Sequence, residues 1–444
     1  MSVKINHIEN EIIDQYLYDE NPTRPWIIGF SGGKDSTVLL QLVWNALKKI
    51  KNKPLQREIH VVCNDTFVEN PIIEQYVNSV LLKIPQEANK QGGLPIFVYK
   101  SIPKLIDTFF VNLIGLGYPA PNNQFRWCTE RLKIDPTSNY IKNKVDENGE
   151  VIVLLGTRIS ESANRAKTIK NHEIKGSRLT EHPNLKNAWI YLPIKELSTE
   201  EVWGYINSVP SPWGANNRTL YNIYADASSD DYECPTLVTN KNSPSCGQSR
   251  FGCWVCTVVK EDKSTNALIQ NGYAWLKPLL DYRNWLVEER NLPENRMNYR
   301  RNGQFLENGG PYEPTYRVKA LEKLLQIQKE VQTNQPFVEL ISHQELVAIQ
   351  LLWYKDDFYK TKVSDIYNSV YEKDLIMNKT NEIIEKEKEL LREVCKDDPE
   401  HFDLIEDLLK IQKTKDLMTH KIGLKSGIEK RIDEFLNNEI KFSE

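Results

Sequence analysis

Residues 31–36, Ser-Gly-Gly-Lys-Asp-Ser, place two hydroxyls, an ammonium group and a carboxylate in one short window. The window follows an apolar run at 26–30 and precedes an amphipathic stretch at 37–50, so it joins a buried strand to a helix N-terminus. Free backbone N–H groups favour an anion there, and glycines let the backbone approach it closely. A plain tight turn would explain the glycines alone, but their polar neighbours favour a phosphate cradle built from Ser31, Gly32, Gly33, Lys34, Asp35 and Ser36.

This loop does not have the pattern of the Walker phosphate-binding loop. Asp35 stands where a Walker loop has the Ser or Thr that binds magnesium, and Ile28 stands where it has its first glycine. The grip on a γ-phosphate is therefore missing, and the phosphates must be held and cleaved in another way.

A second group of reactive residues is a run of cysteines. Four of the seven cysteines, Cys234, Cys246, Cys253 and Cys256, have the spacing C-x11-C-x6-C-x2-C. Such crowding predicts a metal site, and an iron–sulfur cluster and a zinc ion both satisfy the spacing. Phe251 and Trp254 would shield a cluster, so we favour the cluster over zinc, and zinc over a site without metal.

Cys128 lies apart from this run, between Arg126 and the pair Arg131 and Lys133. Nearby cations lower the pKa of a thiol, so we expect a thiolate that could carry or receive sulfur. The alternative is a buried cysteine beside phosphate-binding Arg131 and Lys133. Cys63, in an apolar run, and Cys395, in a charged stretch, are expected to be structural.

The elements that must position these residues alternate along the first 200 residues. Apolar runs at 26–30, 58–63, 94–99 and 151–156 predict buried strands, and the stretches at 37–50, 70–83 and 136–144 between them predict helices. This order predicts an open parallel α/β sheet of the Rossmann-like class, after a first amphipathic helix. Ser31, Asp65 and Thr157 would then lie beyond the carboxyl ends of strands, where such sheets bind ligands.

The rest of the chain differs in texture. Residues 208–312 are rich in Pro, Asn, Ser and Gly and predict a loop-rich subdomain organised by its metal, and residues 313–444 predict a helical region that is a candidate for recruiting partners. The predicted domains are therefore 1–207, 208–312 and 313–444. Ser198 with Glu201, and Ser342 with Glu345, have the spacing of helix capping boxes.

Composition limits the kinds of partner. The 444 residues carry a net charge of −4 and contain neither a membrane-length apolar run nor a visible secretory signal, so we expect a cytoplasmic protein without membrane association. Proteins that bind duplex nucleic acid usually have a large positive excess, which this chain lacks. A nucleic acid substrate would therefore need a local basic surface or a partner that holds it.

Taken as a motif, SGGKDS resembles the PP-loop of the N-type ATP pyrophosphatases. The resemblance implies that ATP, with Mg²⁺, is cleaved between its α and β phosphates. The segment CNDTFVENP (63–71) resembles the part of that family near the nucleotide, where Asp65 would orient magnesium or ribose. LLGTRISESANRA (154–166) resembles its Gly-x-Arg-x-x-Glu-Ser stretch. There Gly156 would lie at the nucleotide, Arg158 and Arg165 would contact phosphate, and Glu161 would hold one of these arginines.

Together with RWCTERLKIDP and GCWVCTVVKEDKS, the loop resembles the DndC family of DNA phosphorothioation sulfurtransferases. This implies a [4Fe–4S] cluster on the four cysteines, and a reaction that adenylates a DNA backbone phosphate and then replaces a non-bridging oxygen with sulfur. Lys34, Cys128, Arg158 and Arg165 would be catalytic. The implied partners are a cysteine desulfurase as sulfur donor, an SMC-like ATPase and a small DNA-binding protein.

Three other functions fit parts of the pattern. An adenylyl-sulfate reductase has the same fold but uses a mobile C-terminal cysteine, whereas this chain ends in NNEIKFSE. A tRNA thiolase shares the loop and a cluster but has paired CxxC motifs, and only Cys253 and Cys256 are so spaced here. A scaffold that binds nucleotide without catalysis is the alternative from another class.

Overall fold

The computed structural model describes residues 2–51, 53–174, 176–227, 251–299, 305–355 and 361–375, with short stretches between 386 and 432. Two compact units are distinguished, residues 1–345 and 346–444. The predicted boundaries at 207/208 and 312/313 stay predictions. The charged stretch 383–398 has the composition of a solvated helix; residues 389–394 are helical, and residues 383–385, 387, 388, 397 and 398 lie outside the described residues.

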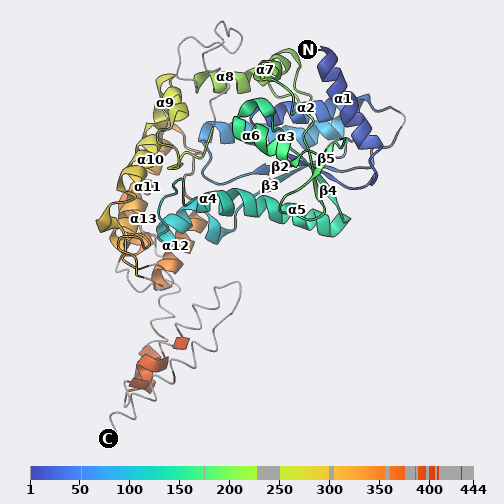
Figure 1. Ribbon diagram of the computed structural model, residues 1–444. Coiled ribbons are helices and arrows are strands. Elements are labelled where there is room, and N and C mark those ends of the chain that lie inside the picture. Colours follow the sequence, from blue (N-terminus) through green and yellow to red (C-terminus); the bar gives the residue numbers. More distant parts are fainter. Residues whose placement is uncertain are drawn as a thin grey trace. The chain divides into compact units, whose positions relative to one another are not determined.

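The first unit is built on a six-stranded sheet in the order β3-β2-β1-β4-β6-β5 (Figure 1). Five strands run parallel, and β5 is antiparallel to β6. The mostly parallel α/β sheet predicted from the alternating pattern is confirmed; the short last two strands were missed. The strands are β1 (Trp26–Gly29), β2 (Ile59–Asn64), β3 (Ile96–Ser101), β4 (Val151–Leu154), β5 (Leu179–Glu181) and β6 (Ala188–Tyr191).

Both faces of the sheet are covered, because successive side chains of a strand point to opposite faces. Trp26 and Ile28 of β1 pack in the larger core with helices α1 (Ser2–Leu17), α2 (Lys34–Lys49), α3 (Pro71–Lys90), α7 (Thr199–Ser208) and α8 (Asn217–Asp226). Ile27 packs on the other face with Ile141 of α5 (Asp135–Asn148). Figure 1 shows α5 on one side of the sheet and α1 to α3 on the other. Burial on both faces explains why β1 and β4 are continuously apolar.

The chain order creates a crevice at the centre of the sheet. From β1 the chain moves outward through β2 to β3, and then returns to place β4 on the opposite side of β1. The connections on the two sides therefore diverge beyond the carboxyl ends of β1 and β4. In open α/β sheets this switch point is where ligands bind, and the loop at 31–36 lies there.

The region 208–312 is more helical than its composition predicts. It contains α8, α9 (Lys263–Gln270) and α10 (Lys277–Glu289), and α10 packs on α11 (Pro314–Asn334). Aromatic contacts hold α10 in place, because its Tyr282 packs on Phe110 and its Trp285 packs on Tyr316. Part of the metal-organised insert predicted here is thus held by aromatic contacts with residues before and after it in the chain.

The remaining elements are short or terminal. Both capping boxes are confirmed: Ser198 caps α7, and Ser342 and Glu345 bond reciprocally at the start of α12 (His343–Lys355). Among the described residues, no helix is long and apolar enough to cross a membrane. The other helices are α4 (Trp127–Thr129), α6 (Ala163–His172), α12 (His343–Lys355) and α13 (Val363–Tyr371), with 3-10 turns at 105–107, 159–161, 274–276 and 293–295 and π-helical turns at 111–115 and 130–134.

Candidate active site

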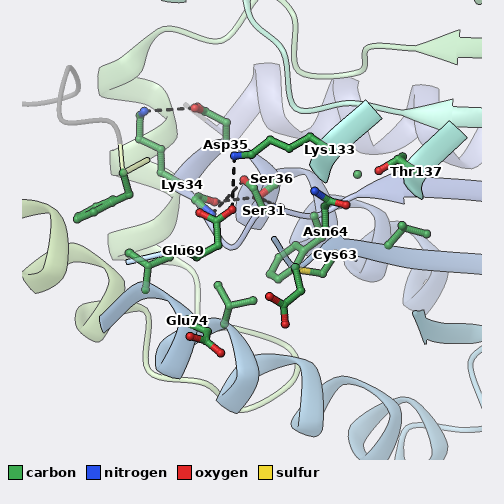
Figure 2. Close-up of a pocket in the computed structure, with 18 of the residues that line it drawn as sticks. Ser31, Lys34, Asp35, Ser36, Cys63, Asn64, Glu69, Glu74, Lys133 and Thr137 are labelled. Carbon is green, nitrogen blue, oxygen red and sulfur yellow. Dashed lines mark hydrogen bonds and ion pairs between the residues drawn. The ribbon is translucent and has the colours of Figure 1, made fainter. Parts of the chain in front are cut away.

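A cavity of about 800 Å³ lies beyond the carboxyl ends of the central strands. We call it the strand-end cavity. Figure 2 shows how the loop residues Lys34 and Asp35, the end of β2 and side chains of α3 and α5 surround it. The structure brings together nine residues of the predicted site on its wall: Ser31, Gly33, Lys34, Asp35, Ser36, Asp65, Lys133, Arg158 and Glu161.

The loop is shaped by its glycine and serine residues. Gly32 has φ +71°, a left-handed conformation, and a Cβ there would also collide with Val77 of α3. Ser31 and Ser36 close the loop, since their hydroxyl oxygens lie 3.2 Å apart and the Ser36 hydroxyl donates to the Gly33 carbonyl at 3.1 Å. The loop runs directly into α2, where the N-cap residue Gly33 has no side chain to cap the first turn and the Lys34 amide donates to the Tyr224 hydroxyl. A helix N-terminus without a side-chain cap is suited to an anion.

Asp35 is the electrostatic centre of the loop. Its carboxylate accepts a hydrogen bond from Arg158 Nε at 2.7 Å and lies 3.2 Å from Lys34 Nζ. Arg158 is buried, at 1% exposure, and its remaining donors reach Ser160, Thr199 and the Leu197 carbonyl. Arg158 therefore holds the loop through Asp35, which is a reason for an aspartate where Walker loops have a hydroxyl.

Two predicted residues, Gly156 and Glu161, help to position Arg158 and the loop. A Cβ on Gly156 would lie 2.9 Å from the Asp35 carbonyl carbon and 3.0 Å from Ser36 N, so only glycine lets the segment after β4 approach the loop backbone. The Glu161 carboxylate accepts from the Arg158 backbone N–H at 3.1 Å. Gly156 and Glu161 thus position Arg158, and Arg158 positions the loop.

The opposite wall carries carboxylates and an amide. Asp65 pairs with Lys100 at 2.6 Å and accepts from the Phe67 amide. Burial, with the charge of Asp65, raises the pKa of Glu74 above its ordinary value. Asn64 donates to the Leu132 carbonyl, while its buried Oδ1 has no protein partner within the described part of the chain, which suits an acceptor for a ligand hydroxyl or amino group.

Magnesium fits this wall only with help from a ligand. Within the described residues, no three His, Cys, Asp or Glu side chains converge as a metal-binding group. Mg²⁺ commonly takes one or two carboxylates together with phosphate oxygens and water. Asp65 is the predicted carboxylate, and nucleotide phosphates would supply the other oxygens.

The cysteine segment is attached to the rim of the strand-end cavity. Glu69 and Cys253 form an antiparallel bridge, and Trp254 N donates to the Val68 carbonyl at 2.9 Å. Glu69 lines the cavity and also pairs with Lys133 at 3.4 Å. Cys253 therefore lies directly behind a wall of the cavity, although more than 180 residues separate it from Glu69.

The donors present fit a metal or cluster in part. Cys253 and Cys256 share one turn, in which Cys256 N donates to the Cys253 carbonyl at 3.0 Å. Burial, with the charge of Glu69, raises the pKa of Cys253 to about 12, so a bound cation would be needed to hold its thiolate. Trp254 packs on Phe110 and Tyr282 as an apolar shell. Cys234 and Cys246 lie outside the described residues.

Cys128 does not have the environment that its neighbours predict. Burial raises the pKa of this thiol, by more than the bond from Thr129 and the charge of Lys133 lower it, so the expected depression is wrong. The nearest arginines in sequence are bound elsewhere, since Arg126 donates to Asn123 and Arg131 to Asp107. The thiol does interact electrostatically with Cys256, so it lies on the cysteine side of the site.

The remaining residues of the predicted site do not lie on the wall of the strand-end cavity or are not described there. Gly32, Gly156, Cys128 and Arg131 do not line the strand-end cavity. Arg165 falls in α6, and its side chain lies outside the described residues.

Several wall residues were not predicted as site residues, among them Tyr224, Phe251 and Lys100. Tyr224 of α8 is buried, and its hydroxyl lies 3.4 Å from Lys34 N and its ring 5.5 Å from Lys34 Nζ. Phe251 packs edge-on against Tyr224, and Lys100 neutralises Asp65. Only Lys100 had a signal, a cation at the end of a predicted strand.

Comparison with known proteins places this geometry in a family. The family model of the phosphoadenosine phosphosulfate reductase domain matches residues 25–259. An uncharacterized protein of Methanocaldococcus jannaschii is 28% identical over 194 residues, which is 44% of this chain and 34% of that protein. The chain thus spans about a third of the length of this relative.

Two solved structures resemble the chain at low identity. The phosphoadenylyl-sulfate reductase of Candida auris is 15% identical, with 47% of this chain and 87% of that chain covered and a TM-score of 0.28. The U34-tRNA thiolase NcsA of Methanococcus maripaludis, solved with its [4Fe–4S] cluster, is 12% identical, with 65% of this chain and 81% of that chain covered and a TM-score of 0.30.

The family match covers the sheet, the loop at 31–36 and the segment with Cys253 and Cys256. It covers more than half of the chain's 444 residues. The chain therefore belongs to the phosphoadenosine phosphosulfate reductase domain family, whose members are enzymes that act on nucleotides.

Proposed function

We propose that this protein is an ATP-dependent sulfurtransferase of DNA phosphorothioation, of the DndC type. One observation carries the proposal: the phosphate cradle at the switch point shares a wall with the cysteine segment, through the Glu69 to Cys253 bridge. The proposed nucleotide site and the cysteine segment therefore lie on the two sides of one wall, and Cys128 interacts with Cys256 of that segment without lining the cavity. The strand-end cavity, at about 800 Å³, is within the range of small-molecule sites.

The first step is adenylation. A non-bridging oxygen of a DNA phosphate attacks the α-phosphorus of ATP, a new P–O bond forms, and pyrophosphate leaves with the electrons of the broken bond. Lys34 and the first amides of α2 stabilise the negative charge that develops on the leaving pyrophosphate. Arg158 keeps Asp35 and the loop in place, and Arg165 is proposed as a further phosphate ligand.

The second step replaces oxygen with sulfur. A persulfide on Cys128 attacks the adenylated phosphorus, a P–S bond forms, and AMP leaves with the electrons of the cleaved P–O bond. A thiol reductant then cleaves the S–S bond and supplies two electrons. A cysteine desulfurase would load the persulfide, and an SMC-like ATPase and a small DNA-binding protein would present the DNA.

Two further groups would assist this chemistry. Mg²⁺ would be held by Asp65 and by the phosphates and would neutralise charge on the nucleotide. A [4Fe–4S] cluster on Cys234, Cys246, Cys253 and Cys256 would supply electron transfer, sulfur donation or order in the segment 208–312. Residues 1–207 would form the catalytic domain, and residues 313–444 would recruit partners.

The products of ATP test the first step. Protein purified without oxygen is incubated with Mg²⁺, ATP and DNA, and the nucleotides are separated by ion-exchange chromatography. We expect AMP and pyrophosphate in equal amounts, and a rate about 100-fold lower for Lys34→Ala, which loses the cation at the leaving group. Lys90→Ala, at an exposed pair with Glu87, is the matched control and should keep the wild-type rate. ADP and orthophosphate as products would contradict the proposal.

The family match also favours a reductase, which a second measurement separates from the sulfurtransferase. Mass spectrometry of digested DNA detects phosphorothioate linkages, whereas a reductase releases sulfite from an adenylyl sulfate. We expect phosphorothioate in the wild type and none with Cys128→Ser. Sulfite release without sulfur incorporation into DNA would assign the protein to the reductases.

A further inference from the structure

A second cavity, of about 580 Å³, lies apart from the strand-end cavity and shares no residue with it. We call it the aromatic cavity. The chain before Cys128 forms one wall and the segment after α10 forms the other. Its walls include Tyr118, Phe125, Arg290, Asn291, Arg296 and Pro311.

Two aromatic rings lie parallel to each other in this cavity. The rings of Tyr118 and Phe125 are nearly parallel, at 4°, with their centres 6.3 Å apart. The Arg131 guanidinium lies 5.0 Å from the centre of the Tyr118 ring and supports it. Phe125 is 41% exposed, so part of its ring is open to a ligand. An exposed ring on a supported platform is the arrangement on which a planar ligand stacks.

The charged groups of the aromatic cavity are positive. Arg290 and Arg296 line it, and none of its described lining residues is acidic. Arg290 Nη1 donates to the Pro121 and Thr257 carbonyls, while its Nε is buried without a protein partner in the described part of the chain. Arg296 donates to the Gly310 carbonyl. A ligand with a negative charge beside a planar ring would match both features.

The aromatic cavity is tied to the cysteine side of the proposed active site. Arg290 holds the carbonyl of Thr257, the residue after Cys256. Trp127, the residue before Cys128, lies 5.8 Å from Tyr118, ring centre to ring centre. Whatever binds in the aromatic cavity is therefore positioned by the same segments that carry Cys128 and Cys256.

We infer that the aromatic cavity binds one unstacked nucleobase of the nucleic acid substrate, with an adjoining phosphate at Arg290 and Arg296. The inference rests on the proposed function, because it assigns a binding site for that substrate. A base stacks on an aromatic ring, and Asn291 offers an amide to its edge. A nucleobase is favoured over an aromatic peptide side chain because two arginines with no acid match the phosphate that accompanies every base.

Binding of short single-stranded DNA tests this site. The probe is a fluorescein-labelled hexathymidylate, and its anisotropy is followed on titration with the full-length protein prepared without oxygen. We expect Phe125→Ala and Phe125→Leu to weaken binding about tenfold, because each removes one base–ring stack. Phe125→Trp keeps a ring and should bind as the wild type does. Phe337→Ala, which removes a phenylalanine that is 98% exposed and lines neither cavity, should have no effect.

The possible results separate the inference from the proposed function. Wild-type affinity for Phe125→Leu would overturn the inference, since bulk without an aromatic ring would suffice. It would also be overturned if an aromatic peptide, but not thymidine dinucleotide, displaced the probe. Lys34→Ala should lose ATP cleavage and keep DNA binding. If the protein cleaves ATP to AMP but its DNA affinity does not change on substitution of Phe125, only the inference about the aromatic cavity is refuted. If the protein does not cleave ATP, the proposed function is refuted.

Discussion

Asp35 has a role at the residue scale that its position in the motif does not reveal. It pairs with both Lys34 and the buried Arg158, so three charged groups share one small volume. Such a network is stable only while each charge keeps its partner. The loop is therefore held in one conformation before any phosphate binds, which reduces the cost of ordering it around the ligand.

Loss of Arg158 should affect folding as well as catalysis. Arg158→Ala leaves Asp35 with one partner and should lower the free energy of unfolding by about 3 kcal/mol, measured by urea denaturation. Arg178→Ala is the matched control, because Arg178 pairs with the exposed Asp14 and should contribute less than about 1 kcal/mol. Equal effects of the two substitutions would show that the buried pair has no special role.

Gly156 sets how closely two loops can approach. Gly156→Ala places a methyl group against the Asp35 backbone, so the loop must shift, and we expect a loss of about 1–3 kcal/mol of stability with an increased KM for ATP. Gly272 has φ +103°, and a Cβ there would meet nothing within 4 Å. Gly272→Ala should therefore lower stability through backbone strain and leave the KM unchanged. An unchanged KM for Gly156→Ala would contradict the close approach.

Glu74 should make stability depend on pH. Burial raises its pKa in the folded protein, so the folded state binds the proton more tightly than the unfolded state. The free energy of unfolding then falls as the pH rises from the ordinary carboxyl pKa to the raised one, and the loss persists at higher pH. Glu74→Gln should therefore stabilise the protein at pH 7, and the gain should vanish below about pH 4.

The control for Glu74 is a glutamate with the opposite shift. A hydrogen bond from Lys90 lowers the pKa of Glu87, which is 27% exposed. Glu87→Gln should give no gain in thermal stability at pH 7. A Glu74→Gln protein no more stable than the Glu87→Gln protein at that pH would rule out the raised pKa.

At the scale of elements, the segment 251–257 joins two parts of the first unit. Its backbone pairs with residues 68 and 69 beside the strand-end cavity, and Trp254 enters the aromatic core of α10. Arg283 of α10 donates to the Cys256 carbonyl at 2.8 Å and fixes the end of the segment. The turn that presents Cys253 and Cys256 therefore has its position fixed by backbone pairing and packing as well as by any metal.

Removing the Trp254 anchor should uncouple the cysteines from the strand-end cavity. Trp254→Ala should cost about 3–5 kcal/mol of stability and lower the iron and sulfide content of protein purified without oxygen. Trp254→Phe keeps a ring in the core and should retain most of the stability and most of the iron and sulfide. Full iron content in Trp254→Ala would mean that the cysteines hold their metal without this packing.

At the scale of the whole molecule, the described residues that line the strand-end cavity or the aromatic cavity all fall between positions 29 and 311. The proposed chemistry therefore belongs to the first compact unit, residues 1–345. The proposed role of the C-terminal region in recruiting partners can be separated from catalysis on this basis.

A protein that ends at residue 375 tests this separation. We expect it to form AMP and pyrophosphate within about twofold of the wild-type rate, because the proposed catalytic side chains remain in place. DNA modification in cells should be lost if the missing region recruits the partners. Circular dichroism confirms that the shortened chain is folded, and wild-type modification in cells would contradict the partner role.

The sequence by itself determined the features that depend on near neighbours. The strand, loop and helix around residues 31–36 follow from a local change of pattern, and the capping boxes of α7 and α12 follow from three-residue spacings. The predicted strands agree with the observed ones within two residues at each end because each contains a short apolar run. β1, β2 and β4 are buried along most of their length, whereas β3 is partly exposed. β5 and β6 were missed because they are short and only partly buried.

Only the tertiary structure decided what distant segments do to one another. Arg158 turns to Asp35, 123 positions away, and Cys253 lies beside Glu69. The sequence neighbours of Cys128 predicted a lowered pKa, but burial raises it, because desolvation depends on everything packed around the thiol. Local pattern fixes elements and loops, whereas burial and long-range pairing set the charge and role of the residues they carry.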